Sequence, residues 1–509
     1  MSQKIYLFLI NRRNHKLLYK FIFSLLFLAF CLNPSFSNAQ KNSPLSNVRQ
    51  ENISIPNGDL KLNGNLFLPI GGNQFPAVVI LHGSGPDEGL EYRVYANEFA
   101  KAGIAALVYD KRGSGKSGGD WQKRPFEFLA GDALAAVKFL KSRSEINPNK
   151  IGLWGISQGG WTAAYAASRS KDVAFVISVA GNGVSPTQQE MFHKDEMLKA
   201  LGYSERARDT ALKFWKLVFD WLVLVDEGKF PLPENLLRSE RAAASTNLDY
   251  DPLPDWGKIT QPVLLIHGGN DKLSPPHQAI TTITDALKES GNQNYSARIF
   301  PNASHTITTN KTGLEFDWDT NFAPNYFQTT TDWILTTADL PTAQPVIETV
   351  STDFPADFRI GGRYGQVPWY GQTYPQIFLM ILFPLLYFLG LGVLFSRLLQ
   401  RNSSKSRQRL PFMLGLICSI NLFLIIGFYY FLATSVFPQG MNLMPPYSIP
   451  WWQKALPIVG ICSLILTIVF LVQVIVEKTE RTKFTISLSI ISTIFLLWLS
   501  YWNLIGLRF

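Results

Sequence analysis

The sequence predicts an α/β fold with a doubly wound, mostly parallel sheet and a helical cap insertion, followed by a four-helix transmembrane region. Three observations predict it. Short β-branched runs alternate with amphipathic helical patterns from residue 51 onward, which is typical of parallel strands joined by crossover helices. Four uncharged apolar runs, each long enough to span a bilayer, follow residue 376. The length of 509 residues exceeds one ordinary core and indicates two or three units.

The composition excludes several classes of protein. Only 17% of the residues are charged and 47% are hydrophobic, whereas about 25% charge is usual in soluble chains. A disordered, coiled-coil or wholly soluble protein is therefore not expected. The three cysteines are too few for a disulfide scaffold, and none forms a Cys-x-x-Cys pair. We predict no metal and no cofactor.

The net charge of +9 does not indicate a nucleic-acid partner. The excess of Lys and Arg lies in residues 1–20, 397–409 and 477–483, beside apolar segments. This distribution is a signature of membrane topology and not of a DNA-binding face. The expected partners are the lipid bilayer and a small acyl or peptide substrate, and the sequence is silent on the oligomeric state.

Residues 1–39 have the pattern of a secretory signal peptide. A basic stretch precedes the apolar run 21–32, which is too short to span a bilayer comfortably. Small residues at Ser37 and Ala39 suit a signal peptidase, so we expect cleavage after Ala39. An uncleaved signal anchor is the alternative.

The soluble domain is expected over residues 40–340. It begins with a hairpin whose turn is Asn57-Gly58. The alternating patterns then predict strands at 77–81, 105–109, 151–154, 173–180, 263–266 and 296–300, and helices at 91–102, 126–143, 161–169 and 276–290.

A helical insertion over about 187–250 interrupts this alternation. It would lie over the carboxyl ends of the strands, where open α/β sheets bind ligands. The run 211–225 is apolar on several faces. Two interpretations stay open: its aromatic residues line an acyl pocket, or they only bury the insertion. The residues concerned are Phe214, Trp215, Phe219 and Trp221.

Residues 341–376 are rich in Pro, Gly and aromatic residues and are interpreted as a linker. We expect Trp369, Tyr370 and Tyr374 to lie at the level of the lipid headgroups. Packing of this segment on the soluble domain is the alternative.

The transmembrane region occupies residues 377–509. Its four apolar runs are 377–395, 410–437, 455–476 and 484–507. The two basic loops, 396–409 and 477–483, should be cytoplasmic. The start of the first span and the chain end then lie outside, so the soluble domain is expected to be extracytoplasmic (periplasmic), as the signal peptide also indicates.

The motif Gly155-Ile156-Ser157-Gln158-Gly159-Gly160 is the main indication of chemistry. An apolar strand leads directly into it and a helix of small residues leads out. A strand–turn–helix of this kind holds a serine in a strained turn with its hydroxyl exposed. The flanking glycines suit a crowded turn, and the N–H of Gln158 would point at a developing oxyanion.

A base and an acid are expected on later loops, because serine is a weak nucleophile at neutral pH. Asp271 follows the strand 263–266, and His305 follows the last strand. Asp271 would fix the tautomer of the imidazole and balance its charge. For the other histidines we favour structural or surface roles.

The segment His82-Gly83-Ser84-Gly85 follows the first buried strand. A turn of this type presents a second backbone donor to the oxyanion, which we assign to the N–H of Ser84. The segment 110–117 looks like a phosphate loop but has Asp110 where the first glycine is required. We interpret it as a turn in which Asp110 and Arg112 brace neighbouring loops.

These motifs together resemble the α/β-hydrolase superfamily over residues 51 to 335. The likeness is to bacterial esterases and to the serine aminopeptidase-like and dienelactone hydrolase-like branches. It implies Ser157 as nucleophile, Asp271 as acid and His305 as base. The matching segments are HGSGP (82–86), YDKRGSGKS (109–117), GISQGG (155–160), HGGNDKLSPP (267–276) and NASH (302–305).

Three hypotheses about function follow. The first is a membrane-tethered serine hydrolase that cleaves carboxylic esters through an acyl-enzyme. The second is an amidase or aminopeptidase, in which Asp87, Glu88 and Glu91 would bind a free amine. The third is a sensor or transporter without catalysis, which the absence of intramembrane charge disfavours.

Overall fold

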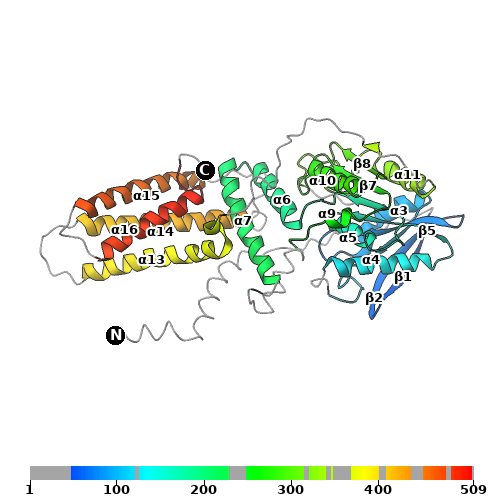
Figure 1. The fold of residues 1–509 in the computed structure, drawn as a ribbon, viewed down its shortest axis with the longest axis horizontal. Coiled ribbons are helices and arrows are strands. Elements are labelled where there is room, and N and C mark those ends of the chain that lie inside the picture. Colours follow the sequence, from blue (N-terminus) through cyan, green and yellow to red (C-terminus); the bar gives the residue numbers. More distant parts are fainter. Residues whose placement is uncertain are drawn as a thin grey trace. The chain divides into compact units, whose positions relative to one another are not determined.

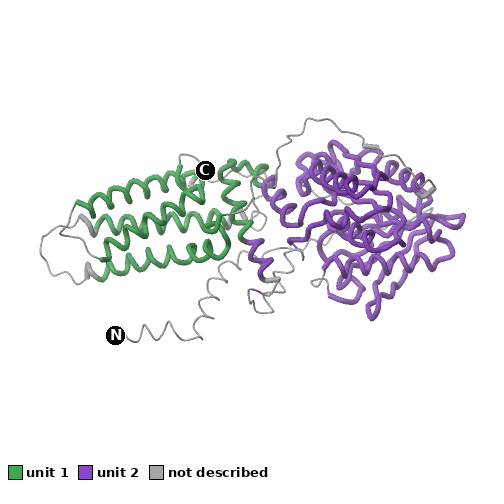
Figure 2. Tube along the Cα trace, viewed as in Figure 1, with its two compact units in different colours: residues 1–41, 198–217, 366–509 green, residues 42–197, 218–365 purple. Residues whose placement is uncertain are grey.

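The computed structural model describes residues 48–120, 125–226, 229, 248–314, 320–339, 346–347, 368–399, 409–436, 451–476 and 483–506. The predicted signal peptide and most of the two basic loops lie outside the described residues. The chain forms two compact units (Figure 2). Unit 2 holds the described residues up to Met197 and those from Val218 to 347. Unit 1 holds Leu198–Leu217 and the described residues from 368 onward.

Unit 2 is built on a sheet of nine strands among the described residues, in the order β1-β2-β4-β3-β5-β6-β7-β8-β9 (Figure 1). β1 and β2 form an antiparallel hairpin, β2 pairs antiparallel with β4, and the remaining pairs are parallel. The strands are β1 Val48–Asn57, β2 Leu60–Pro69, β3 Phe75–Leu81, β4 Ala105–Tyr109, β5 Ile146–Ile156, β6 Val176–Val179, β7 Val263–Gly268, β8 Tyr295–Phe300 and β9 Val346–Ile347.

Helices cover both faces of this sheet. Alternate residues of β3 point to opposite cores, because Val79 packs in one apolar cluster and Val78 in the other. The first cluster includes α4 Phe126–Lys141, α5 Gln158–Ala167 and α10 Pro276–Glu289. The second includes α3 Arg93–Lys101 and α11 Tyr326–Asp339. The short elements η1 Gly89–Tyr92 and α9 Leu253–Trp256 also belong to this unit. The doubly wound α/β-hydrolase fold is confirmed.

Most of the predicted elements are present, with small differences at their ends. The hairpin turn consists of Gly58 and Asp59, one residue later than predicted, because Asn57 still pairs with Leu60. α5 begins at Gln158 and not at residue 161. α11 and β9 were not predicted. Two helices of the insertion are described, α6 Pro186–Ala200 and α7 Glu205–Asp226.

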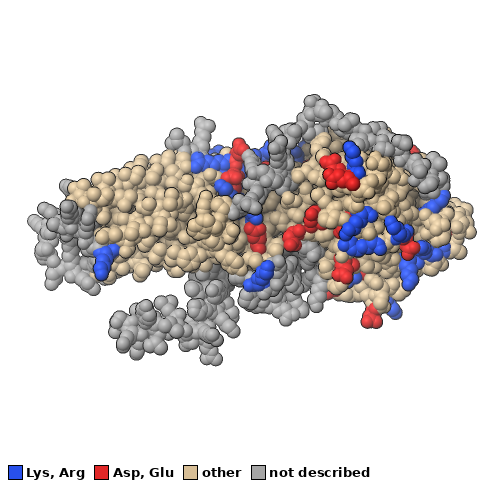
Figure 3. Space-filling view, viewed as in Figure 1, with Lys and Arg blue, Asp and Glu red and all other residues tan. Residues whose placement is uncertain are grey.

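Among the described residues, unit 1 contains four helices that are long and apolar enough to cross a membrane: α13 Thr373–Leu399, α14 Arg409–Val436, α15 Trp451–Val476 and α16 Lys483–Tyr501. The short turn η2 Trp369–Gly371 precedes them. The visible surface of these helices is almost free of charged residues, whereas charges are spread over unit 2 (Figure 3). Trp369, Tyr370 and Tyr374 are exposed, as an interfacial position requires.

α16 ends at Tyr501, before the predicted residue 507. Asn503 has a φ of 56°, and the N–H of Leu504 donates to the carbonyl of Leu499, which closes the helix end in a left-handed cap. The following residues are not helical but turn into contact with the insertion helix α7. The four predicted apolar helices are therefore present, and the last is shorter than predicted.

Half of the insertion belongs to unit 1. Side chains of α7 donate hydrogen bonds to backbone carbonyls at the end of α16. Thr210 donates to the carbonyl of Trp502 over 3.0 Å, and Lys213 donates to the carbonyl of Tyr501 over 3.0 Å. Asn503 donates to Asp209 over 2.9 Å. The predicted domain map placed the whole insertion with the soluble domain, and the structure divides it at residues 198 and 218.

Gln376 is the centre of a buried polar network in unit 1. Its Oε1 accepts the indole N–H groups of Trp498 and Trp502, each over 2.9 Å. Its Nε2 donates to the carbonyl of Tyr370 over 2.6 Å. One amide side chain thus satisfies both indoles, for which an unpaired N–H in an apolar environment is costly.

We expect Gln376→Leu to destabilise unit 1 by about 2–4 kcal/mol, because two buried indole N–H groups lose their acceptor. The midpoint of thermal unfolding in detergent, followed by tryptophan fluorescence, measures the effect. Gln372→Leu is the matched control, since Gln372 lies one turn earlier and is exposed. Equal midpoints for the two variants contradict the expectation.

Candidate active site

Ser157 lies in a strained turn between β5 and α5. Its φ of 54° and ψ of −118° are rare for a residue other than glycine. Its N–H donates to the carbonyl of Val179 over 2.8 Å, and its carbonyl accepts the N–H of Gly160 over 2.9 Å. Both neighbours therefore hold the turn, as predicted for a nucleophile presented above a sheet.

The backbone around Ser157 leaves no room for a side chain at either flanking glycine. A Cβ atom at Gly155 would lie 2.1 Å from the carbonyl oxygen of Gly159. A Cβ atom at Gly159 would lie 2.4 Å from the carbonyl oxygen of Leu81, at the end of β3. The first turn of α5 thus touches the backbone that leads into the segment 82–85.

Asp271 and His305 are brought together by the ends of β7 and β8. Nδ1 of His305 lies 2.9 Å from Oδ2 of Asp271, and both side chains are buried. Oδ1 of Asp271 accepts the N–H groups of Leu273 and Ser274 over 2.7 and 2.9 Å. A carboxylate accepts hydrogen bonds, so this contact suits the His305 tautomer that carries its proton on Nδ1 and directs the lone pair of Nε2 away from Asp271.

The three residues predicted as a triad share one edge of the sheet. Ile156 of β5 pairs with Val179 of β6, which pairs with Ile266 of β7. β7 pairs in turn with β8 up to Phe300. Because these strands are parallel, their carboxyl ends meet at the same edge, and Ser157, Asp271 and His305 follow three of them.

The segment 82–85 lies beside Ser157. A Cβ atom at Gly83 would be 4.0 Å from Cβ of Ser157. The N–H of Gly83 donates to the hydroxyl of Tyr92 over 2.9 Å, and that hydroxyl donates to Asp87 over 2.9 Å. Ser84 is exposed. Gln158 is buried at the start of α5, where backbone N–H groups have no acceptor within the helix.

The structure adds Lys111, which the sequence interpretation did not single out. It follows β4, is buried, and its ammonium contacts Gly83, Gly85 and Gln158. The one signal in the sequence was its place two residues after a buried strand. The neighbouring braces are as predicted: Asp110 accepts the N–H of Gly89 over 3.0 Å, and Arg112 pairs with Asp132 over 2.7 Å.

Burial keeps the other histidines near this edge neutral at pH 7. Burial, aided by the charge of Lys111, lowers the pKa of His82 to about 3. Burial lowers the pKa of His267 to about 4, against a smaller opposing effect of Asp271. His193 of α6 contacts the carbonyl of Lys272 over 3.1 Å, and burial lowers its pKa too.

The predicted acyl-pocket residues are divided between the units. Phe214 and Trp215 belong to unit 1, and Phe219 and Trp221 to unit 2. Trp215 and Phe219 are buried, and the other two are half-buried. Burial suits either interpretation of the insertion, so the pocket stays a prediction.

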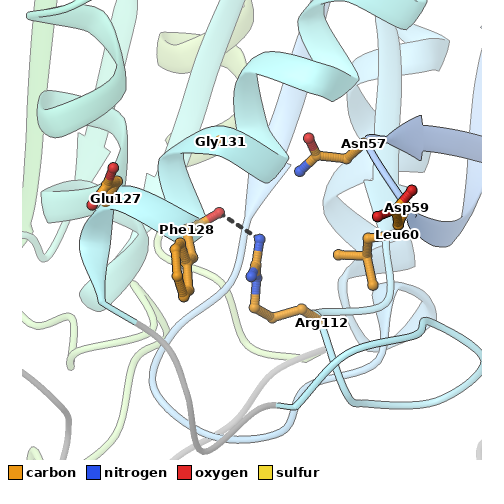
Figure 4. Close-up of a pocket in the computed structure, with 7 residues that line it drawn as sticks. All are labelled: Asn57, Asp59, Leu60, Arg112, Glu127, Phe128 and Gly131. Carbon is orange, nitrogen blue, oxygen red and sulfur yellow. Dashed lines mark hydrogen bonds between the residues drawn. The ribbon is translucent and has the colours of Figure 1, made fainter.

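A pocket of about 560 Å³ lies elsewhere on unit 2, near the β1–β2 turn (Figure 4). Its Arg112 donates to the carbonyl of Phe128 over 2.9 Å and is paired with Asp132, so its guanidinium is already engaged. The lining residues are Asn57, Asp59, Leu60, Arg112, Glu127, Phe128 and Gly131, and none belongs to the predicted triad. Among the described residues no cluster of His, Cys, Asp and Glu could hold a metal ion.

Two family models match the chain, and both describe hydrolases. Residues 62–200 match the dienelactone hydrolase family. Residues 134–310 match the C-terminal domain of the BAAT and acyl-CoA thioester hydrolase family. The resemblance to α/β hydrolases is thereby confirmed.

Relatives whose names state a function match parts of the chain. Esterase EstD of Thermotoga maritima is 28% identical over 48% of this chain and 58% of its own length. Thiohydrolase aneE of Aspergillus aculeatus is 40% identical over 24% of this chain and 37% of its own length. A solved structure of a Pyrococcus furiosus esterase is 19% identical, with a TM-score of 0.39, and the match covers 60% of this chain and 94% of that one.

The buried His267 predicts a loss of stability in acid. The unfolded chain takes up its proton near pH 6.5, whereas the folded chain does so near pH 4. Stability present above pH 6.5 is therefore lost as the pH falls toward 4, by about 3 kcal/mol at most.

We expect His267→Leu to show a smaller fall of the unfolding midpoint between pH 7 and pH 4.5 than the wild-type protein. His277→Leu is the control, because His277 is only half-buried and should change the pH dependence less. Identical pH profiles for His267→Leu and the wild-type protein contradict the assignment.

Proposed function

We propose that the protein is a membrane-tethered, extracytoplasmic serine hydrolase that cleaves carboxylic esters through an acyl-enzyme. The observation that carries the proposal is the 2.9 Å hydrogen bond between His305 and Asp271 at the sheet edge where Ser157 occupies its strained turn. The matches to hydrolase families support the reaction class.

In this mechanism Oγ of Ser157 attacks the acyl carbon while Nε2 of His305 takes the hydroxyl proton. Asp271 stabilises the imidazolium that forms. The carbonyl oxygen becomes an oxyanion and accepts the N–H groups of Gln158 and Ser84. The imidazolium returns its proton to the leaving alcohol, and a water molecule then hydrolyses the acyl-enzyme by the same steps.

Two other bonds, a thioester and an amide, are alternatives to the carboxylic ester as the bond that is cleaved. The thioester hydrolase model and the similarity to a thiohydrolase favour thioesters as a second substrate class. For an amine subsite, Asp87 is a weak candidate, because its carboxylate already accepts the hydroxyl of Tyr92. Relative kcat/KM values for matched acyl esters, thioesters and aminoacyl amides separate the three classes.

Membrane tethering rests on the four apolar helices of unit 1. The extracytoplasmic location rests on the basic loops and on the signal-like residues 1–39. The role of the helices exceeds that of an anchor, since part of the insertion is built into their unit.

We expect Ser157→Ala to lower kcat for a short acyl ester by at least about 10³-fold, because the nucleophile is lost. Labelling by a fluorophosphonate probe should also disappear. Ser144→Ala is the matched control, since Ser144 is exposed and distant in sequence from the turn. Turnover or labelling that survives in Ser157→Ala removes Ser157 as the nucleophile.

The topology predicts opposite accessibility of two engineered cysteines. Ser144→Cys lies on unit 2 and should react with a membrane-impermeant maleimide in intact spheroplasts. Ser403→Cys lies in the loop 396–409 and should react only after lysis. The wild-type protein controls for its own cysteines, and the reverse pattern would place the catalytic unit in the cytoplasm.

A further inference from the structure

Lys111 is a buried lysine that contacts residues on both sides of Ser157's turn, Gln158 and the segment 82–85. It lies two residues after the end of β4, and only 3% of its surface is exposed. Burial of an ammonium group is costly unless all of its donors find acceptors. The N–H groups of Lys111 therefore need acceptors within the protein.

The ammonium binds both sides of the predicted oxyanion site. Nζ donates to the carbonyls of Gly83 and Gly85 over 2.5 and 3.0 Å. It also donates to Oε1 of Gln158 over 2.9 Å. The segment that contains one predicted donor, Ser84, is thereby tied to the residue that supplies the other.

The contact with Gly83 has a geometric consequence. The carbonyl of Gly83 and the N–H of Ser84 belong to one planar peptide unit and point in opposite directions when it is trans. Since the carbonyl faces Lys111, the N–H of Ser84 faces away from it. The N–H of Gly83 is already bound to Tyr92, so this turn is fixed on its other side as well.

We propose that Lys111 is a positioning residue that orients and polarises the N–H of Ser84 as an oxyanion donor; this rests on the proposed serine-hydrolase function. A cation on the carbonyl withdraws electron density from the peptide unit and strengthens its N–H as a donor. The donor is held in place before the reaction, so no reorganisation is needed when the oxyanion forms.

A double-mutant cycle with Lys111→Met and Ser84→Pro tests the proposal, because proline removes the N–H of residue 84. We expect each single variant to lower kcat by about 10²-fold, with KM changed less than about 3-fold. The double variant should lose little more than either one. Losses that multiply would show that Lys111 acts independently of Ser84 and overturn the proposal.

Affinity for a trifluoromethyl ketone, whose serine adduct carries an oxyanion, should fall in parallel with kcat/KM. Unchanged affinity in Lys111→Met also overturns the proposal. Lys141→Met is the matched control, because Lys141 forms an exposed ion pair with Asp172. If Lys111→Met does not fold, Lys111→Gln enters the same cycle, with a smaller loss and the same non-additivity expected.

Fluorophosphonate labelling separates failure of this inference from failure of the proposed function. A wild-type protein that is labelled at Ser157 retains the serine-hydrolase assignment whatever the cycle shows. A wild-type protein without labelling or ester turnover overturns both.

Discussion

The close approach of α5 to the end of β3 is the constraint on which the candidate site depends. At Gly159 a single methyl group would lie 2.4 Å from the carbonyl oxygen of Leu81. The strained backbone of Ser157 leads directly into this contact, and the segment 82–85 lies beside the nucleophile. One packing contact between glycine and backbone thus positions the serine and both predicted oxyanion donors together.

Unit 1 also depends on hydrogen bonds to backbone carbonyls. The last carbonyls of α16 find no N–H donor further along the helix, and they lie at the negative end of its dipole. Arg206, Thr210 and Lys213, spaced four and three residues apart on α7, donate to them or to the residues just beyond. Residues of the insertion helix α7 therefore supply hydrogen-bond partners at the end of the last helix of unit 1.

The sequence predicted a mostly parallel sheet, most of its strands and the loop residues that follow them, because short β-branched runs, glycines and a histidine after the last strand are local signals. It did not predict α11, or that Lys111 is buried. A lysine beside Arg112 and Lys116 reads as a solvated charge, and only the fold shows that three neutral acceptors surround it. The division of the insertion between units is likewise a tertiary property.

The charges of the site lie where the proposed reaction would separate charge. Asp271 stands at the end where an imidazolium would form, and Lys111 stands behind the donors that would face the oxyanion. His82, at the end of β3, is kept neutral at pH 7, because burial lowers its pKa to about 3. The fold thus holds the carboxylate of Asp271 and the side chain of Lys111 in buried positions, where their charges would favour a charge-separated transition state over neutral reactants.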